Sequence, residues 1–210
     1  NKRKTSIVLG NDEKVLYGKG FIVDELCGLK FKISPKSFYQ INHHQCEILY
    51  HKALELLNLK GNEIVIDAYC GIGTIGMIAS SKVKEVIGVE VNKDAVKDAI
   101  NNAKMNKISN IKFVNDDATA FMIKLAKQKQ KVDCIIMDPP RSGSTKEFMD
   151  AIKILSPQKV VYISCDPSTQ VRDIKYFAKL GYRSNVMYPV DMFPHTTHIE
   201  TIVSIQRKDM

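Results

Sequence analysis

The residues best suited to chemistry form a glycine-rich turn after a buried-strand pattern. Ile64–Ile66 is a short β-branched run, Asp67 closes it, and Gly71, Gly73 and Gly76 follow at the G-x-G-x-x-G spacing. This pattern predicts a strand, a tight turn and a helix N-terminus that a ligand can approach closely. Two ligands fit. One is a dinucleotide, whose pyrophosphate would face the helix N-terminus. The other is S-adenosyl-L-methionine (SAM), whose amino-acid end would lie against the turn.

Polar residues also follow the other four β-branched runs. Glu90 ends the second, Asp116 and Asp117 follow the third, Asp138 follows the fourth, and Ser164-Cys-Asp-Pro167 follows the fifth. Because ligands of an open parallel sheet bind beyond the carboxyl ends of its strands, we expect these groups to surround one site. An acid at Glu90 would accept hydrogen bonds from both hydroxyls of a ribose, and Asp116 and Asp117 would meet an adenine amino group.

The Asp138-Pro-Pro-Arg141 segment favours SAM over a nicotinamide cofactor. Two prolines after a strand hold an extended, rigid ledge against which a flat base can lie. Methyltransferases that act on bases need such a ledge, whereas dehydrogenases do not. Enzymes that methylate an exocyclic amine carry an aromatic residue after the two prolines, and this chain has Arg141 there. The segment therefore disfavours amine methylation and leaves carbon methylation open.

Carbon methylation of a pyrimidine requires a nucleophile, because carbon 5 of uracil is too electron-poor to attack a sulfonium methyl unaided. Cys165 follows a strand, and Pro167-Ser168 starts a helix whose N-terminus would lower the thiol pKa and favour the thiolate. The other cysteines are expected to be small buried residues. A base must then remove the carbon-5 proton, and His195, His198 and Glu200 are the candidates. Two histidines without a third ligand do not indicate a metal site.

Alternating strand and helix patterns position these groups. Strands are expected near residues 63–67, 85–89, 111–115, 132–137 and 159–163, and helices near 74–81, 92–106, 117–130, 146–155 and 167–179. This alternation predicts an α/β, Rossmann-like fold whose mostly parallel, seven-stranded sheet has helices on both faces. The last strand-like stretches, 183–188 and 200–206, have no helix between them, so an antiparallel terminal strand should complete the sheet.

The beginning of the chain is different. Strand patterns at 6–9, 15–17, 20–23 and 29–33 predict short β-hairpins, which we interpret as residues 1–33 forming the tail of an upstream domain. Ser34-Pro35 predicts the start of a long helix that reaches about Leu59. Its apolar face would contain Ile48, Leu49, Ala53, Leu56 and Leu57. Residues 34–210 would form the catalytic domain. Because the chain begins at Asn1, we expect it to be a piece of a longer protein.

The overall amino-acid composition restricts the cellular location and the kind of binding partner that we expect. No apolar run is long enough to span a membrane. The 5 cysteines are scattered without a C-x-x-C pair, so neither a disulfide framework nor a zinc site is indicated, and a reducing, cytoplasmic location fits best. A net charge of +8 favours a polyanionic partner such as RNA, although a lysine-rich proteome would give the same balance.

Taken together, these motifs resemble the RNA uracil-C5 methyltransferases, the SAM-dependent family that makes 5-methyluridine in rRNA and tRNA. The matching segments are Ser37–Asn42, Asp67–Thr74, Gly88–Glu90, Asp138–Arg141, Ser164–Pro167 and His198–Glu200. The resemblance implies Cys165 as the nucleophile and Glu200 as the base. It also implies a set of SAM contacts: Gln40, Tyr69, Glu90 and Asp138, with Gly71, Thr74 and Asp117 nearby.

Within this family, the amino-acid sequence of residues 67–74 and 193–200 is most similar to that of the 23S rRNA enzymes, which implies an rRNA substrate. Bacterial rRNA-type members carry an upstream RNA-binding β-barrel and a cysteine-ligated iron–sulfur cluster. No clustered cysteines precede Ser34, so no metal is expected in this chain. Three alternatives remain. A tRNA uracil-C5 methyltransferase lacks the barrel by nature, an NAD-dependent oxidoreductase shares the glycine spacing and Glu90, and a non-catalytic RNA-binding module shares only the basic charge.

Overall fold

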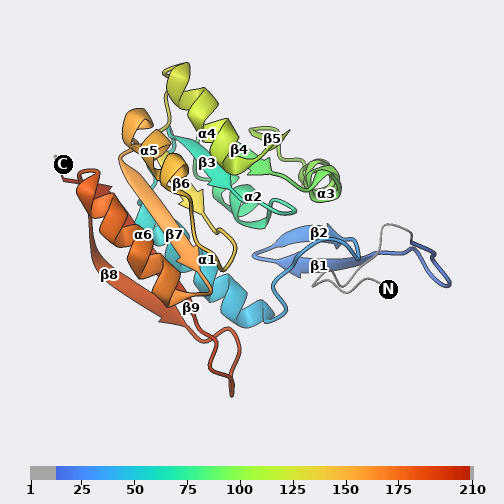
Figure 1. The fold of residues 1–210 in the computed structure, drawn as a ribbon. Helices are drawn as coiled ribbons and strands as arrows, with labels where there is room; N and C mark the ends of the chain where they lie inside the picture. Colours follow the sequence, from blue (N-terminus) through green and yellow to red (C-terminus); the bar gives the residue numbers. More distant parts are fainter. Residues whose placement is uncertain (1–12, 209–210) are drawn as a thin grey trace.

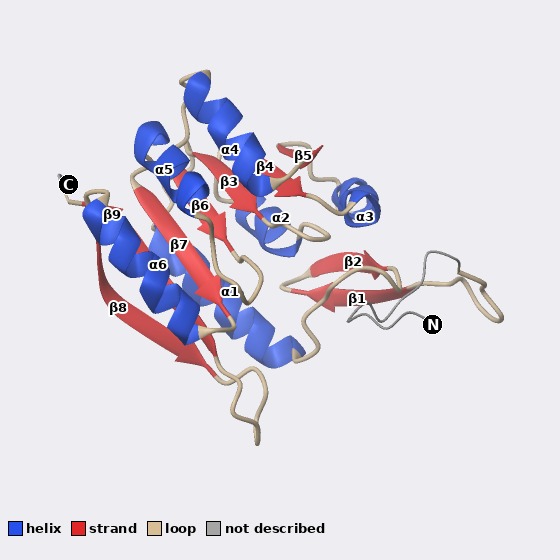
Figure 2. Cartoon of the chain, in the orientation of Figure 1, coloured by secondary structure: helices blue, strands red, loops and turns tan. Residues whose placement is uncertain are grey.

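The structure, a computed structural model, describes residues 13–208, and its main feature is a seven-stranded sheet with helices on both faces (Figures 1 and 2). The strand order is β5-β4-β3-β6-β7-β9-β8. The strands are β3 (Ile64–Ala68), β4 (Glu85–Glu90), β5 (Ile111–Asn115), β6 (Cys134–Met137), β7 (Lys159–Ser164), β8 (Tyr182–Val190) and β9 (Glu200–Arg207). The helices are α1 (His43–Leu57), α2 (Thr74–Ser80), α3 (Lys93–Met105), α4 (Ala118–Lys127), α5 (Lys146–Leu155) and α6 (Pro167–Lys179).

The two faces of the sheet are covered by different helices. On one face, α1, α2 and α3 share a hydrophobic cluster with residues such as Val65 and Val161. On the other face, α4, α5 and α6 pack on the alternate residues, for example Ile66 and Tyr162. Successive side chains of a strand point to opposite faces, so a strand buried on both sides needs apolar residues at both parities. The continuous β-branched runs in the sequence supply them.

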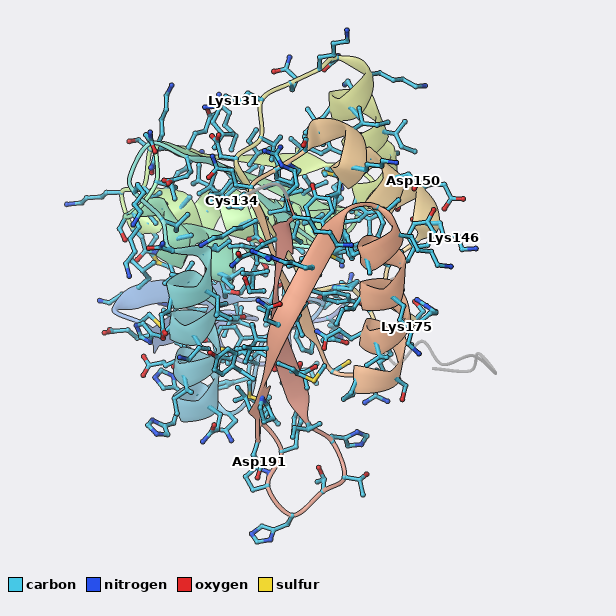
Figure 3. All side chains as sticks on the ribbon, turned by 90° about the vertical axis from the view of Figure 1, so that its left-hand side faces the viewer. Lys131, Cys134, Lys146, Asp150, Lys175 and Asp191 are labelled. Carbon is cyan, nitrogen blue, oxygen red and sulfur yellow. The ribbon has the colours of Figure 1, made fainter. Side chains whose placement is uncertain are left out.

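The sheet confirms the predicted α/β fold, including its antiparallel terminal strand. Strands β3 to β7 pair with one another in parallel, whereas β9 lies antiparallel between β7 and β8. The connection from β8 to β9 contains no helix, as expected, and its loop projects beyond the sheet, as Asp191 marks in Figure 3. The carboxyl end of β7 therefore meets the beginning of β9.

A separate hairpin, β1 (Ile22–Leu26) and β2 (Leu29–Ile33), lies against the α3 side of the sheet (Figure 1). Its buried Leu26 and Phe31 belong to the same cluster as α1. Asn102 of α3 and Asn106, which caps the C-terminus of that helix, each exchange hydrogen bonds with the backbone of β2 at 2.7 to 3.2 Å. These amides occupy the free edge of β2, which would otherwise present unpaired backbone groups.

Two predictions near the start of the chain are wrong. The first helix begins at His43, not at Ser34: Ser34–Ser37 closes a tight turn, and Asn42 caps the helix through the Gln45 backbone N–H at 3.3 Å. A proline compatible with a first helical turn is equally compatible with a β-turn, which explains the error. Residues 15–17 form no strand, and the expected strand at 6–9 lies outside the described residues.

The apolar face of α1 also differs from the prediction. Its buried residues are Cys46, Leu49, Tyr50, Ala53, Leu54 and Leu57, while Ile48 is exposed.

Among residues 13–208, no helix combines the length and the apolar character that a membrane crossing requires. The domain boundary at residue 33 stays a prediction.

Candidate functional site

The glycine turn between β3 and α2 adopts conformations that ordinary residues avoid. Gly71 and Gly73 have φ values of 54° and 82°, and a Cβ at Gly73 would lie 2.7 Å from the Phe113 ring. Tyr69 also has a positive φ, 66°, although it carries a large side chain. Backbone strain of this kind costs about 1–3 kcal/mol and concentrates at functional sites. At Gly73 the turn is thus shaped by its close approach to the Phe113 ring, whereas the predicted approach of a ligand is possible at Gly71, where a Cβ would meet no atom within 4 Å.

Asp67 and Gly76 explain the third glycine of the motif. The Gly76 N–H donates to Oδ2 of Asp67 at 2.9 Å, and a Cβ at Gly76 would lie 2.6 Å from that oxygen. Asp67 is buried at 1% exposure. Burial raises its pKa to about 7, the Gly76 hydrogen bond opposes this, and the charge of Glu90 adds to it. Gly76 therefore allows α2 to approach Asp67 rather than to approach a ligand directly.

Glu90, at the end of β4, supports the same turn. Its carboxylate accepts the Gly71 N–H at 3.0 Å through Oε2 and the Asn92 N–H at 2.8 Å through Oε1. Each carboxylate oxygen has a further lone pair, so both remain able to accept a hydrogen bond from a ligand hydroxyl. The expected ribose contact at Glu90 is compatible with this arrangement and stays a prediction.

A cavity beside the glycine turn brings most of the expected cofactor residues together. Gln40, Tyr69, Gly71, Thr74 and Asp138 all line it. They come from the segment before α1, from the turn after β3, from α2 and from the end of β6. Its volume of about 50 Å³ can enclose only one end of a ligand the size of SAM.

Two aromatic residues also line this cavity: Tyr39, which belongs to the matching segment Ser37–Asn42, and Tyr50, which was not expected from the sequence. Tyr50 of α1 is buried, and its hydroxyl lies 3.1 Å from Oγ1 of Thr74. Tyr39 packs its ring 6.5 Å from Phe31 of the hairpin. Their aromatic character belongs equally to a core pattern, so periodicity alone does not distinguish them from ordinary packing residues.

Of the two carboxyl groups that line the cavity, Asp138 has the more strongly raised pKa. Its carboxylate accepts no hydrogen bond from any residue between 13 and 208 that the structure describes. Removal from water raises its pKa to about 8, and the charges of Glu200 and Asp67 add to this. Two carboxylates that face one small cavity without a cation suit a positively charged ligand. The ammonium and sulfonium groups of SAM have that chemistry, so the residues present fit this cofactor.

Cys165 lies between β7 and α6 and is half-buried. Asp166 caps α6 through the backbone N–H groups of Ser168 and Thr169 at 2.9 and 3.2 Å. The predicted lowering of the thiol pKa is wrong: burial raises the Cys165 pKa, the charges of Glu200 and Asp138 add to the rise, and Arg141 partly offsets it. The Asp166 carboxylate already occupies the helix N-terminus, which weakens any effect of the helix dipole on the thiol.

Strand register brings Glu200 beside Cys165. Ser164, the last residue of β7, pairs with Thr201 of antiparallel β9, so the residues immediately beyond this pair, Cys165 and Glu200, lie at the same end of the two strands. Glu200 is 4% exposed. Burial raises its pKa, and the Arg141 guanidinium opposes that rise. A thiol, a carboxyl group that retains its proton more readily than usual and a guanidinium therefore meet at one point.

A buried hydrogen-bond network fixes that register. Thr201 donates its hydroxyl to the Ser164 carbonyl at 3.1 Å, and the same hydroxyl lies 2.8 Å from Oε1 of Gln170. Gln170, on α6 and fully buried, donates its Nε2 to the Tyr162 carbonyl at 2.9 Å. Strands β7 and β9 and helix α6 are thereby joined directly behind Cys165. No local sequence signal marks Gln170 or Thr201.

Three other predicted groups lie apart from this centre. His195 and His198 are exposed on the loop between β8 and β9, and the His198 ring packs 6.4 Å from Phe193. Asp117 caps α4 by accepting the Ala120 N–H at 2.9 Å and does not line the cavity. Within residues 13–208, no group of three potential metal ligands comes together. All five cysteines are free thiols.

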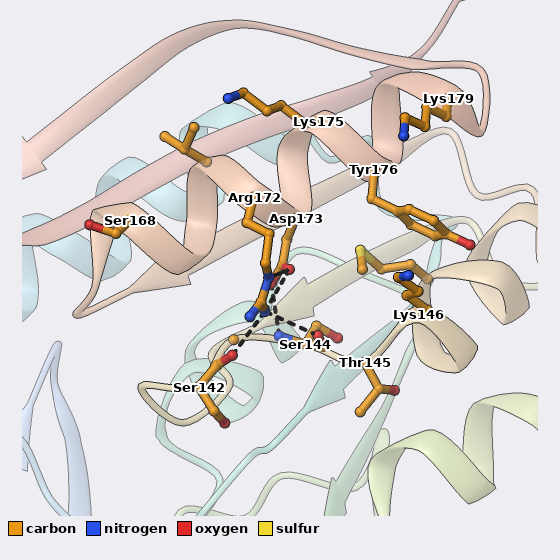
Figure 4. A pocket seen from close by; sticks show the side chains of 13 residues that line it. Ser142, Ser144, Thr145, Lys146, Ser168, Arg172, Asp173, Lys175, Tyr176 and Lys179 are labelled. Atoms are coloured by element: carbon orange, nitrogen blue, oxygen red, sulfur yellow. Dashed lines mark hydrogen bonds and ion pairs between the residues drawn. The ribbon is translucent and has the colours of Figure 1, made fainter.

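The segment after Asp138 is held on α6 by a buried acid that sequence reasoning missed. Asp173, on α6, is buried, and its Oδ2 accepts the Ser144 N–H and the Tyr162 hydroxyl, each at 2.8 Å. Arg172 pairs with the other oxygen at 2.8 Å and donates to the Ser142 carbonyl at 2.8 Å (Figure 4). Thr169 donates to the Arg141 carbonyl at 3.1 Å. The ledge and the helix after Cys165 therefore form one rigid unit.

Comparison with known sequences gives a family match over most of the chain. The family model described as tRNA (Uracil-5-)-methyltransferase matches residues 6–208. An uncharacterized RNA methyltransferase of Caldanaerobacter subterraneus is 46% identical over 207 residues, which cover 99% of this chain and 46% of the relative. An uncharacterized RNA methyltransferase of Clostridium tetani is 44% identical over 97% of this chain and 44% of the relative. The chain thus spans about half the length of the curated relatives it matches.

Solved structures give the same result. The Pyrococcus abyssi tRNA (uracil-54, C5)-methyltransferase, in complex with S-adenosyl-L-homocysteine, is 32% identical with a TM-score of 0.81, and the match covers 98% of this chain and 49% of that one. A Geobacter metallireducens precorrin-6y C5,15-methyltransferase is 15% identical with a TM-score of 0.66, covering 84% of this chain and 94% of that one. The second likeness concerns the fold alone.

Proposed function

Because this chain belongs to the tRNA (uracil-5-)-methyltransferase family, we propose that it methylates carbon 5 of a uridine in RNA through a covalent adduct between Cys165 and carbon 6. The observation that carries the proposal is the meeting of Cys165, Glu200 and Arg141 beside the Asp138 cavity. The family is one of SAM-dependent methyltransferases, so the nicotinamide alternative loses its support.

The chain's own residues account for each proton and electron pair. The Cys165 thiolate, stabilised by Arg141, forms a bond to carbon 6, and the electrons of the carbon 5–carbon 6 double bond move to carbon 5 and the carbonyl at carbon 4. When bound, SAM supplies the methyl group that carbon 5 accepts. The Glu200 carboxylate removes the carbon-5 proton, the double bond re-forms, and the bond between sulfur and carbon 6 breaks. Cys165 leaves as the thiolate.

The cofactor would be held by residues that already line the cavity. Asp138 and Asp67 provide negative charge for the amino-acid end of SAM, and Gly71 leaves open space above the turn. Because the enclosed part is small, the adenosine would extend over the turn toward Glu90. Asp117, near the end of β5, would meet the adenine through its carboxylate oxygen that does not cap α4.

We propose that the RNA substrate is rRNA, because the amino-acid sequence of residues 67–74 and 193–200 resembles that of the rRNA enzymes. A tRNA substrate is the second candidate, which the similarity to the Pyrococcus abyssi tRNA enzyme favours. A target base must leave its stack to reach the ledge at Asp138 and Cys165. We further propose a cytoplasmic location, since all five cysteines are free. Radiolabelled methyl transfer to 23S rRNA and to unmodified tRNA transcripts, measured side by side, distinguishes the substrates.

A trapping assay tests the reaction itself. The protein is mixed with SAM and a 5-fluorouridine-substituted RNA and run on a denaturing gel beside Cys165→Ala and Glu200→Gln. Fluorine at carbon 5 cannot be removed as a proton, so the adduct should persist in the wild type and disappear in Cys165→Ala. With ordinary uridine, Glu200→Gln should accumulate an adduct that the wild type resolves. A shifted band that survives Cys165→Ala, or no band from any of these proteins, would contradict the proposed mechanism.

A further inference from the structure

A groove runs between α5 and α6, next to the segment that continues from Asp138 (Figure 4). Its volume is about 750 Å³, far larger than the cavity at the glycine turn. The loop at Ser142–Thr145 closes one end, Lys146 and Met149 stand on the α5 side, and one exposed face of α6 forms the other wall. Arg172 donates a hydrogen bond to this loop and Asp173 accepts one from it, and the two bonds hold the groove in shape.

Three lysines line the groove without an ion-pair partner among the residues that the structure describes. Lys146, Lys175 and Lys179 line it, and none of them lies within ion-pair distance of a carboxylate among residues 13–208. The carboxylate of Asp173, by contrast, is paired with Arg172. The acids near the groove are on α5. Asp150 accepts the Tyr176 hydroxyl at 2.9 Å, and the charge of Glu147 contributes to the raised pKa of Tyr176. Figure 3 shows Lys146, Asp150 and Lys175 on one side of the molecule.

We propose that this groove binds the phosphate backbone of the RNA strand that carries the target uridine. The inference rests on the proposed function and adds to it the path of the RNA outside the catalytic centre. Lys175 and Lys179 are one helical turn apart, so their cations follow each other along the groove as phosphates do along a strand. At the end nearest Cys165, Ser142, Thr145 and Ser168 add hydroxyl groups that can donate to phosphate oxygens.

The position of the groove relates it to the reaction. Thr169 of α6 donates to the Arg141 carbonyl, and Arg141 acts on the Cys165 thiol, so the groove begins within a few residues of the nucleophile. Val171, which is 41% exposed, provides apolar surface on which sugars or splayed bases can pack. RNA recognition of this kind combines a positive channel with such surfaces and depends strongly on salt.

The test uses a fluorescent single-stranded RNA of mixed sequence and measures its binding by anisotropy at several salt concentrations. Lys146→Glu/Lys175→Glu/Lys179→Glu is compared with Lys124→Glu/Lys127→Glu/Lys129→Glu, which makes the same change in net charge on exposed lysines at the far end of α4. The groove variant should lose at least about tenfold in affinity, and its log–log salt slope should fall by about 2 for three lost phosphate contacts. The control should stay within about threefold of the wild type.

Equal losses in both variants, or unchanged binding by the groove variant, would overturn the assignment. Lysine acylation followed by mass spectrometry gives a second readout on the unmutated protein: RNA should protect Lys146, Lys175 and Lys179 but not Lys124 or Lys127. If poly-glutamate displaced the RNA as well as unlabelled RNA does, the groove would instead accept acidic polypeptides, and the proposal would fall.

The experiments can contradict the groove assignment and the proposed function independently of each other. If RNA protects the three groove lysines in a protein that transfers no methyl group to RNA, the groove assignment stands and the proposed function falls. If the wild type makes 5-methyluridine and the groove variant does so with an unchanged KM, the proposed function stands and the groove assignment falls.

Discussion

The carboxylate of Asp173 occupies the space that a side chain at Gly143 would need. A Cβ at position 143 would lie 2.6 Å from Oδ2 of Asp173 and 2.5 Å from Nη2 of Arg172. The loop after the Asp138 ledge can approach α6 this closely only because Gly143 has no side chain and adopts a φ of 77°. The position of the loop at Ser142–Thr145 therefore depends on a glycine and a buried acid that lie outside the proposed catalytic centre.

Gly143→Ala should accordingly reduce both stability and activity. We expect a loss of about 1–3 kcal/mol in the free energy of unfolding from the backbone strain of a positive φ, a further loss because the new Cβ displaces Asp173 and Arg172, and a fall in kcat. The matched control is Gly28→Ala, because Gly28 has a φ of 75° but no atom within 4 Å of its would-be Cβ. Urea unfolding and methyl-transfer kinetics on both variants measure the difference. If Gly28→Ala costs as much as Gly143→Ala in both assays, the contact with Asp173 has no role.

Thr201→Val should weaken catalysis by loosening the register between β7 and β9. The substitution keeps the shape but removes the hydroxyl that bonds the Ser164 carbonyl and meets Gln170. Leaving a buried polar group unsatisfied costs about 1–3 kcal/mol. Thr201→Ser keeps the hydroxyl and should retain most of the activity. Trapping of 5-fluorouridine RNA in the two variants checks this, and equal adduct yields at equal folded fractions would count against the role of Thr201.

SAM binding should be pH-dependent because of Asp138, whose pKa is raised to about 8. The free protein holds this proton below pH 8, whereas a cationic ligand favours the carboxylate, so binding releases a proton. Affinity should therefore rise with pH, by up to about tenfold per pH unit below 8, and level off above it. Calorimetry in buffers of different ionisation enthalpy measures the proton release. Asp138→Asn should bind SAM more weakly and without this dependence, while Asp191→Asn, at an exposed position, should match the wild type.

The same pKa affects stability in the opposite direction. An aspartate whose pKa is higher in the folded than in the unfolded state stabilises the fold most below about pH 4, and this contribution is lost as the pH rises through 8. Asp138→Asn should thus unfold with a flatter pH dependence between pH 4 and 8 in the absence of ligand. An unchanged pH dependence of the urea midpoint would refute this.

Arg141→Ala should make Cys165 less reactive at neutral pH. Arg141 lowers the pKa of the Cys165 thiol, against burial and the charge of Glu200, so its removal should raise that pKa further. The rate of iodoacetamide alkylation at Cys165, followed by peptide mass spectrometry, should then need a higher pH to reach its plateau. Arg141→Lys keeps the charge and should shift the profile less. Identical profiles for wild type and Arg141→Ala would show that the guanidinium does not stabilise the thiolate.

Much of the fold could be read from local patterns. The β-branched runs before Asp67, Glu90 and Asp138 predicted their strands, because strands buried on both faces must be apolar at every position. The glycine spacing predicted the turn and α2. The prediction of the α1 start failed because Ser34-Pro35 suits a turn as well as a helix, and only packing decides between them.

The sequence by itself determined the strand–helix alternation, the glycine turn, the membership of a methyltransferase family and the identities of Cys165 and Glu200 as candidates. Only the tertiary structure decided which groups meet. Cys165 and Glu200 lie together because β9 pairs with β7 in one antiparallel register, and Gln170, Asp173 and the groove between α5 and α6 gain their roles from helices packed on that register. Local propensity acts over a few neighbouring residues, whereas strand pairing and helix packing join residues far apart in the chain, so no local pattern encodes them.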